Sequence, residues 1–396
     1  MAMVIRMRWT GLPLLLVGAG LAAVLTGSPA GAGAYTVNTT ADTPDLVPGD
    51  GLCADAGGSC SLRAAIVEAN ARPGDDEVSL PAGTFTIGLT GDDDDGAVGD
   101  LDLNASDGTA TTITGAGAGA TVVDGGGVDR VFHLVRGSAS LAGLTIRNGV
   151  RSGGAGGGVL AAASTSLTLR DLELRGNAAG DGGGLRNEGA TILTRVLVAA
   201  NSGSAALSNG AGTLTVVNST VSTNSAPGVR STGGGIGLTH VTITGNAGGI
   251  TVAGGNVTLR NSIVAANDGD ECSGAVGSQG HNVVEDSSCG PTATDRPATD
   301  PGIAVLAANG GPTQTHGLVG GSPAIDLVGD GACPVADDQR GVGRPIDGDA
   351  NGSALCDAGA FEAGGPVTPS PGTTTTTRRG QLPPATPRPG RPTTAG

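Results

Sequence analysis

The chain has 396 residues, of which 74 are glycine and 1% are aromatic, and its formal net charge is −15. Such an acidic chain repels a phosphate backbone, so nucleic acid is excluded as a general partner. The scarcity of aromatic residues excludes a thick aromatic core and favours thin layers of small aliphatic side chains.

Residues 1–34 have the three parts of a secretory signal peptide. Two arginines give a positive start, an apolar stretch runs from Leu12 to Leu25, and Ala32 and Ala34 precede an expected cleavage site. The apolar stretch is shorter than the ~18–20 residues of a membrane-spanning helix. We therefore expect a secreted or cell-surface protein that is not an integral membrane protein after signal cleavage.

Residues 35–76 are expected to form an N-terminal cap. Ser61 is a suitable N-cap for a helix from Leu62 to Ala71, whose apolar residues fall on one face. We expect this short helix to cover the open end of the repeat that follows it, because a stack of strands exposes its end unless something covers it.

The six cysteines indicate disulfides, because their number is even and the chain carries an export signal. Six cysteines permit many connectivities, but these lie in sequence-local pairs. Zinc is the alternative, and the sequence lacks the CxxC spacing and nearby histidines of a zinc site. The predicted disulfides are Cys53–Cys60, Cys272–Cys289 and Cys333–Cys356.

Residues 77–289 carry a repeat in which six segments alternate apolar and polar residues, as half-buried strands do. Glycine-rich turns separate the segments. A period of roughly 20–30 residues with strands and no helical pattern indicates a solenoid. The sequence therefore predicts an all-β stack of parallel strands with about nine coils, in which each coil adds one narrow row of aliphatic side chains.

Each of the six segments ends in asparagine. Stacked asparagine amides hydrogen-bond from one coil to the next, and asparagine also tolerates the left-handed backbone conformation. The sequence thus predicts a structural ladder of Asn148, Asn177, Asn201, Asn224, Asn246 and Asn267.

Residues 290–362 lose the repeat and contain the last two cysteines, so we expect them to close the C-terminal end of the stack. Residues 363–396 are rich in proline and threonine, which predicts a disordered, extended tail.

The segment CSLRAAIVEAN (60–70) resembles the CSLREA motif of a bacterial exported β-helix family, with Ala64 where that family usually has glutamate. Three later segments, NGGPTQTHGL (309–318), GSPAID (321–326) and CDAGAFE (356–362), look like the C-terminal module called choice-of-anchor Q. The resemblance implies a right-handed parallel β-helix, similar to the pectin-lyase-like fold, at the bacterial cell surface or secreted. That family has no established common activity.

The segment DGDANG (347–352) predicts a structural calcium site. Its acidic and amide side chains stand at positions 1, 3 and 5 of an oxygen-ligand loop, with a glycine at the turn. The last ligand position holds alanine, so the acid beside it is taken as the substitute, and a solvated acidic turn is the alternative. The predicted ligands are Asp347, Asp349, Asn351 and Asp357. No other cofactor is expected.

Two further groups of acids are typical of exposed loops, with calcium as the minor alternative. One is the run DDDD (92–95), and the other consists of Asp42, Asp45 and Asp50.

We predict adhesion, binding or structural display, without catalytic activity, toward an extracellular polysaccharide or protein. The alternative is a polysaccharide lyase or glycoside hydrolase of the pectate-lyase-like type, because parallel β-helices in other families have that activity. A glycosidase needs two carboxylates that face one groove. The acids that could face outward from the coils are Asp171, Glu173, Asp181 and Glu188.

No catalytic residue is assigned. The sequence contains neither the motif series of polygalacturonases nor the characteristic motif of pectate lyases. It also has almost no aromatic residues on which a sugar ring could stack. No serine-hydrolase or zinc-protease motif surrounds any histidine, so we expect only tolerated polar residues at His133, His240, His281 and His316.

Overall fold

The computed structural model describes residues 31–105, 108–329 and 331–366. Almost all of the predicted signal peptide and of the predicted C-terminal tail lie outside these ranges. Within the described part of the chain, no helix is both long and apolar enough to cross a membrane.

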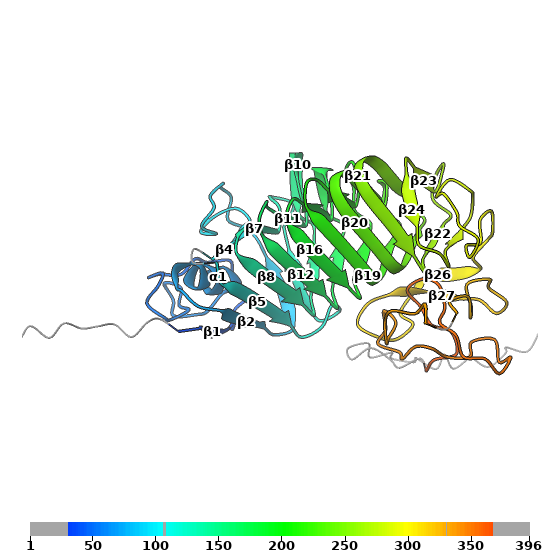
Figure 1. Ribbon diagram of the computed structural model, residues 1–396. Helices are drawn as coiled ribbons and strands as arrows, with labels where there is room; N and C mark the ends of the chain where they lie inside the picture. The colour runs from blue at the N-terminus through cyan, green and yellow to red at the C-terminus, as the bar shows by residue number, and fades with distance from the viewer. Residues whose placement is uncertain (1–30, 106–107, 330, 367–396) are drawn as a thin grey trace, which may run out of the picture.

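The chain winds into a coil with three faces, and each strand pairs in parallel with its counterparts one turn before and one turn after it (Figure 1). Three long strands bend around the corners and contribute to more than one face: β19 (Thr213–Ser222), β20 (Val229–Thr244) and β21 (Ile250–Arg260). Face 1 consists of parts of these strands with β1 (Ala34–Thr36), β2 (Asp76–Leu80), β5 (Ala110–Gly115), β8 (Ser138–Ala142), β12 (Ser166–Arg170), β16 (Ala190–Thr194) and β24 (Val276–Ser278).

The other two faces are built in the same way. Face 2 consists of parts of β19 and β20 with β3 (Gly83–Thr86), β6 (Thr121–Asp124), β9 (Thr145–Arg147), β13 (Glu173–Arg175), β17 (Leu197–Ala199), β22 (Ile263–Ala265) and β25 (Val283–Val284). Face 3 consists of parts of β20 and β21 with β4 (Leu101–Asn104), β7 (Phe132–Arg136), β11 (Val159–Ala161), β15 (Leu185–Asn187), β18 (Leu207–Asn209) and β23 (Cys272–Ser273). A small separate pair, β10 (Val150–Ala155) and β14 (Ala178–Asp181), projects from the coil.

The predicted solenoid is confirmed, but it has about seven regular turns, which run from β5 to β23, and not about nine. The difference lies at the two ends. In the first turn, residues 87–100 loop out between β3 and β4, and the last turn is incomplete because it has only β24 and β25.

The inside of the coil is one side chain deep on each face. Alternate residues of a strand point inward, as in β12, where Leu167 and Leu169 are buried between exposed or half-buried neighbours. In-register pairing then stacks each inward residue on its counterparts. The row through the middle of face 1 is Ile113, Leu141, Leu169, Leu193, Val216, Leu238 and Leu259.

Five of the six predicted asparagines form the ladder. Each side-chain amide donates to the side-chain oxygen of the next asparagine at 2.7–3.1 Å, and the last one donates to Glu271 at 2.6 Å. Each side-chain oxygen also accepts the backbone N–H of the asparagine before it. The buried ladder runs through Asn177, Asn201, Asn224, Asn246 and Asn267.

Asn148 does not belong to the ladder, which corrects the prediction. Its amide donates to Asp124, and the ladder oxygen of Asn177 accepts instead from the backbone N–H of Gly149, one residue later. The alignment by terminal asparagine is therefore shifted by one residue in this turn.

The left-handed conformation also falls on a different residue from the one expected. In the ladder turns it is taken by the residue before the asparagine, with φ between +55° and +66°, and not by the asparagine itself. Glycine fills this position in two turns, whereas three turns hold residues with a Cβ. The positions are Gly176, Ala200, Thr223, Gly245 and Ala266.

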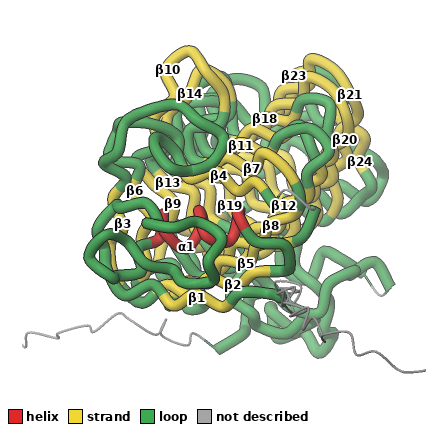
Figure 2. Tube along the Cα trace, turned by 90° about the vertical axis from the view of Figure 1, so that its left-hand side faces the viewer, coloured by secondary structure: helices red, strands yellow, loops and turns green. Residues whose placement is uncertain are grey.

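The helix α1 (Leu62–Ala71) covers the N-terminal end of the coil, as predicted (Figure 2). The Ser61 side chain accepts the backbone N–H of Ala64 at 2.9 Å, so the expected N-cap is present. Arg63 is fully buried and donates to Asp42 and to the carbonyl oxygens of Gly96 and Gly99. The helix therefore closes the end and also holds the loop between β3 and β4.

Residues 301–366 do not close the other end, which corrects the expected cap. The last turn is followed by residues 285–300, which bond to β25 and are tied to β23 by the Cys272–Cys289 disulfide. The chain then turns back and lies along face 2 as a separate module, which includes the antiparallel pair β26 (Ile303–Ala307) and β27 (Thr315–Leu318) (Figure 1). Outward residues of face 2 and residues of the module form a second core: Ile263, Ala265, Val283, Ala324, Val328, Cys356 and Ala358.

We expect Asn224→Leu to lower the free energy of unfolding by roughly 2–5 kcal/mol, because it leaves buried N–H and C=O groups of the preceding turn without partners. Guanidinium unfolding followed by circular dichroism measures the change. Asn148→Gly, at the half-exposed asparagine outside the ladder, serves as the control and should change the free energy by about 1 kcal/mol or less. Equal effects of the two substitutions would contradict the ladder's role.

Ala200→Gly is expected to raise the free energy of unfolding by roughly 0.5–1 kcal/mol, because the left-handed conformation strains an alanine more than glycine's extra entropy costs. Ala199→Gly, one residue earlier in strand β17, should lower it by roughly 1 kcal/mol. The same unfolding measurement compares the two neighbours, and effects of the same sign would contradict the explanation.

Candidate functional site

A groove lies between face 2 and the module. It comprises two adjoining cavities of about 460 and 350 Å³ that share Gly119, Gly311 and Pro312 in their walls. One wall is the turn 116–119 and the corner after β12, and the opposite wall is formed by module residues 308–314 and 337–341. We call it the module groove.

Glycine is required in the module's wall of this groove. Gly311 has φ +75°, and a Cβ there would lie 2.4 Å from the Cα of Arg340. Arg340 itself is fixed by an ion pair with Asp338 and by its position 3.6 Å over the ring of Phe361. The turn at 308–314 therefore packs directly against the second module segment and keeps the wall in place.

Two polar side chains of the groove, those of Asp171 and Arg195, come from one corner of the coil. Between face 1 and face 2, seven successive turns each place one residue in the left-handed conformation. Asparagine, aspartate and glycine adopt this conformation at low cost, whereas arginine and histidine need a structural reason for it. The corner residues are Gly143, Asp171, Arg195, Asn218, His240, Asn261 and His281.

Arg195 links the coil to the module inside the groove. Its guanidinium donates to both oxygens of Asp171, at 2.6 and 2.8 Å, and to Asp337 of the module at 3.1 Å. The hydrogen bond to Asp171 raises the pKa of Arg195. Asn218 donates to the backbone oxygen of Asp337 at 2.8 Å. Two carboxylates, one from the coil and one from the module, thus accept hydrogen bonds from one arginine.

Glu173 lies two residues after Asp171 and has a different environment. Burial raises its pKa, and its ion pair with Arg175 is long at 3.4 Å. Arg175 also reaches Gln314 of the module at 3.3 Å. The groove therefore contains one carboxylate bound closely by an arginine and one whose burial favours its protonated form.

Residues 109–264 and 157–298 match the family model described as "Right handed beta helix region". The chain is a right-handed parallel β-helix. A solved structure titled "Crystal structure of pectate lyase Pel9A" aligns with a TM-score of 0.42 and 15% identity over 85% of this chain and 97% of that chain. No curated protein matches the chain.

The β-helix brings together only two of the four outward acids proposed from the sequence. Asp171 and Glu173 line the module groove, whereas Asp181 and Glu188 both pair with Arg186 on face 3. The sequence analysis missed Arg195 and Asp337, which come from segments far apart in the chain. The only local indication for Arg195 was that it directly follows a strand with alternating apolar and polar residues, which places it at a corner of the coil.

The predicted calcium loop lies in the module, where three carboxylates come together. Oxygen atoms of Asp347, Asp349 and Asp326 lie within 4.8 Å of one another. Asp347 accepts the backbone N–H groups of Asn351 and Gly352 at 3.0 and 2.8 Å, so the loop closes around it. Asp326 was missed, because it lies about twenty residues before the loop and no sequence spacing connects the two segments.

Asp357 does not belong to this group, which corrects the predicted ligand set. It is fully buried and accepts the backbone N–H groups of Asp326 and Ala363 at 2.8 and 2.5 Å. Burial raises the pKa of Asp357 to about 6. Asn351 is also engaged within the loop, since it donates to Asp349 and its oxygen accepts the backbone N–H of Ser353.

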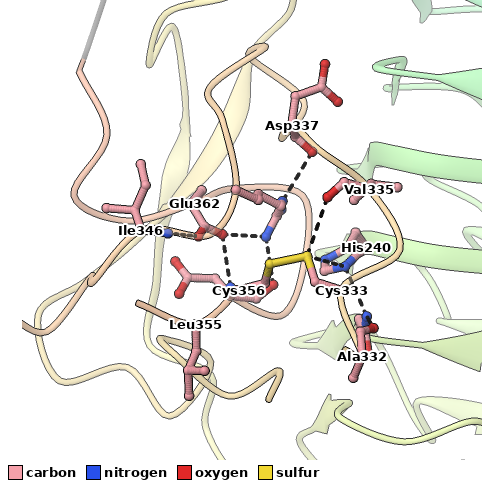
Figure 3. The surroundings of a disulfide bond; sticks show 12 residues. His240, Ala332, Cys333, Val335, Asp337, Ile346, Leu355, Cys356 and Glu362 are labelled. Atoms are coloured by element: carbon pink, nitrogen blue, oxygen red, sulfur yellow. Dashed lines mark hydrogen bonds and ion pairs between the residues drawn. A yellow bond between two sulfur atoms is a disulfide. The ribbon is translucent and has the colours of Figure 1, made fainter. Parts of the chain in front are cut away.

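The three predicted disulfides are all present: Cys53–Cys60, Cys272–Cys289 and Cys333–Cys356. The third lies where the module meets the coil, against the corner residue His240 (Figure 3). Asn261 donates to His240 Nε2 at 3.0 Å if that atom carries no proton, and burial holds the pKa of His240 well below its usual range. The imidazole is therefore neutral and packs in the interface.

His316 also lies in this interface, between Ser222 of β19 and the backbone oxygen of Ala304, and burial lowers its pKa. The group of Asp42, Asp45 and Asp50 does not form a cluster. Asp42 pairs with Arg63, and the other two accept nearby backbone N–H groups.

Proposed function

We propose that this β-helix is a secreted or cell-surface bacterial protein of the CSLREA type, with a choice-of-anchor Q-like module, that binds an extracellular polysaccharide in the module groove. The observation that carries the proposal is the lining of the groove. Arg175, Gln314 and Asp337 offer planar polar groups along walls that contain several glycines. Such groups suit the vicinal hydroxyls of a sugar chain, and glycine lets the chain approach the backbone.

A polysaccharide fits this lining better than a folded protein partner does. Protein interfaces depend on a few buried aromatic or large aliphatic anchors. Within the groove the apolar residues are small, namely alanines and Pro312. Binding then depends on several weak polar contacts along an extended polymer, which is consistent with adhesion or display.

The groove also favours one catalytic alternative. Glycoside hydrolysis uses one carboxyl group that carries a proton and one that is ionised. Burial raises the pKa of Glu173, and Asp171 is a second carboxylate in the same groove. Against this role, both oxygens of Asp171 are already bound by Arg195, so neither is free to attack a sugar or to activate water.

The first test measures binding and turnover with the same polysaccharides. We expect the chain without its signal peptide to bind at least one neutral or acidic polysaccharide and to release no new reducing ends or unsaturated products. Arg175→Ala should weaken binding by about tenfold or more, because a hydrogen bond to a charged group contributes roughly 1.5–3 kcal/mol. Isothermal titration calorimetry measures the affinity.

Arg147→Ala is the matched control for this test. Arg147 pairs in register with Arg175 one turn earlier and is equally exposed, at 41% against 42%, but it does not line the groove. Equal loss of binding in both variants would contradict the groove as the binding site. If the wild type releases products and Glu173→Gln abolishes this release, the protein is a hydrolase or lyase and the proposed binding function is wrong.

We also propose that the loop 347–352 binds a structural calcium ion together with Asp326. Its carboxylate oxygens are the ligands that calcium prefers, and the three acids come from two segments of the module that an ion would join. Calcium at about 100 times its Kd should stabilise the protein by roughly 2.7 kcal/mol. Thermal unfolding with calcium and with chelator measures the shift.

Asp349→Asn should remove this calcium effect, whereas Asp357→Asn should leave the calcium-dependent shift in place, since Asp357 lies outside the group. A shift that survives Asp349→Asn would contradict the proposed site.

A further inference from the structure

A second group of possible metal ligands lies at the other end of the molecule, on face 3. Asp102 of β4 pairs in register with His133 of β7. The flanking residues Leu101 and Leu103 point into the core, so Asp102 points outward from the coil. It is nevertheless fully buried, because the loop that contains the DDDD run folds back over it.

The loop is held in this position by specific contacts. Gly96 has φ +78°, and a Cβ there would lie 3.3 Å from the backbone nitrogen and oxygen of Asp102. Asp93 accepts three backbone N–H groups of the loop. Asn70 of α1 donates to the backbone oxygens of Asp95 and Asp102. The loop therefore lies directly on the strand, fixed from both sides.

This arrangement places three ligand atoms together. His133 Nδ1 lies 3.0 Å from Asp102 Oδ1 and 3.9 Å from Asp94 Oδ1, and all three ligand atoms lie within 4.8 Å of one another. Two ligand atoms bound to one tetrahedral zinc ion at about 2.1 Å lie about 3.4 Å apart. The observed distances lie on either side of this value, so small side-chain movements bring the atoms to one ion.

A separate observation, an unpartnered carboxylate oxygen, indicates that this group binds a cation or a hydrogen-bond donor. Asp102 Oδ2 is buried and has no hydrogen-bond partner within the described part of the chain, although its carboxylate already contacts His133 through Oδ1. A buried, half-satisfied carboxylate is costly unless a cation or donor pairs with it.

The neighbouring arginines do not supply that positive charge. Arg130 donates to Asp100 and to the backbone oxygens of Ala155 and Gly156. Arg151 is paired with Asp129 and Asp92. Both arginines are therefore engaged with other acids, and the imidazole of His133 is the basic group that contacts Asp102.

We propose that Asp94, Asp102 and His133 bind a zinc ion, with water at the fourth position. An imidazole ligand favours zinc and other transition metals over calcium or magnesium, which prefer oxygen. Two carboxylates balance the charge of a divalent ion. Exposure falls from 71% for the side chain of Asp94 to 16% for His133 and 0% for Asp102, so an ion enters from the loop side and meets the buried acid last. The bound ion joins the loop to two strands of the coil.

The test is zinc binding by the full secreted chain without a polyhistidine tag, after removal of metal with a chelator. Equilibrium dialysis with elemental analysis should find one zinc ion that is lost in His133→Gln. The affinity should fall by more than about a hundredfold, because even changes outside the ligand shell cost about 10–100-fold. Cobalt is the second probe, and its visible absorption should show a site of low coordination number in the wild type and not in the variant.

Two controls separate this site from others. His281→Gln and Asp349→Asn, in the last turn and in the calcium loop, should leave zinc binding unchanged. The side chain of Asp94 is exposed and is not part of the core. Asp94→Asn therefore tests the site even if the Asp102→Asn variant fails to fold. Zinc affinity and stoichiometry that are equal in the wild type, His133→Gln and Asp94→Asn would overturn the proposal, and Asp102 and His133 would then form a metal-free pair.

Discussion

Every strand of the coil is bonded to the strand one turn before it and the strand one turn after it, so each position in a turn is repeated along the whole stack. The inward row of face 1 needs an aliphatic residue in every turn, and the ladder position needs a side chain that both donates and accepts. Because the interior is one side chain deep, aliphatic side chains fill most of it, and only a few aromatic residues, such as Phe85 and Phe132, are buried there in the described part of the chain. The glycine-rich, aromatic-poor composition follows from this geometry.

The same constraint decides where chemistry can occur. Inside the stack, polar groups serve only to satisfy one another, as the amides of the asparagine ladder do. Functional side chains must lie at corners, on outward faces or in loops that leave the coil. The corner between face 1 and face 2 holds a left-handed residue in seven successive turns, and four of these residues lie against the module: Asp171, Arg195, Asn218 and His240. The module groove exists because the chain turns back along these corners and does not cover the end of the stack.

Prediction from the sequence succeeded where the information was local. The helix and its Ser61 cap, the three sequence-local disulfides and five members of the ladder all depend on residues within one or two turns of each other. It failed where one residue of register or a long-range contact decided the outcome. Asn148 matches the repeat by residue type, but Gly149 occupies the ladder position. Asp357 lies one residue before the last ligand position and is buried in the module. Arg195 meets Asp337 across 142 residues, which no local pattern indicates.

Both proposed metal sites follow from the same geometric argument. Segments that leave the coil lack the repeated hydrogen bonds of stacked strands, so another interaction must fix them. At the N-terminal end, the loop between β3 and β4 is held by Arg63 and Asn70, yet it covers the unpartnered oxygen of Asp102. In the module, the loop 347–352 is held mainly by its own acids and by Asp326. An ion at either position replaces the missing coil-to-coil bonds with ligand bonds. The ligand types differ, with a nitrogen at the first site and only oxygens at the second, so the two sites select different metals.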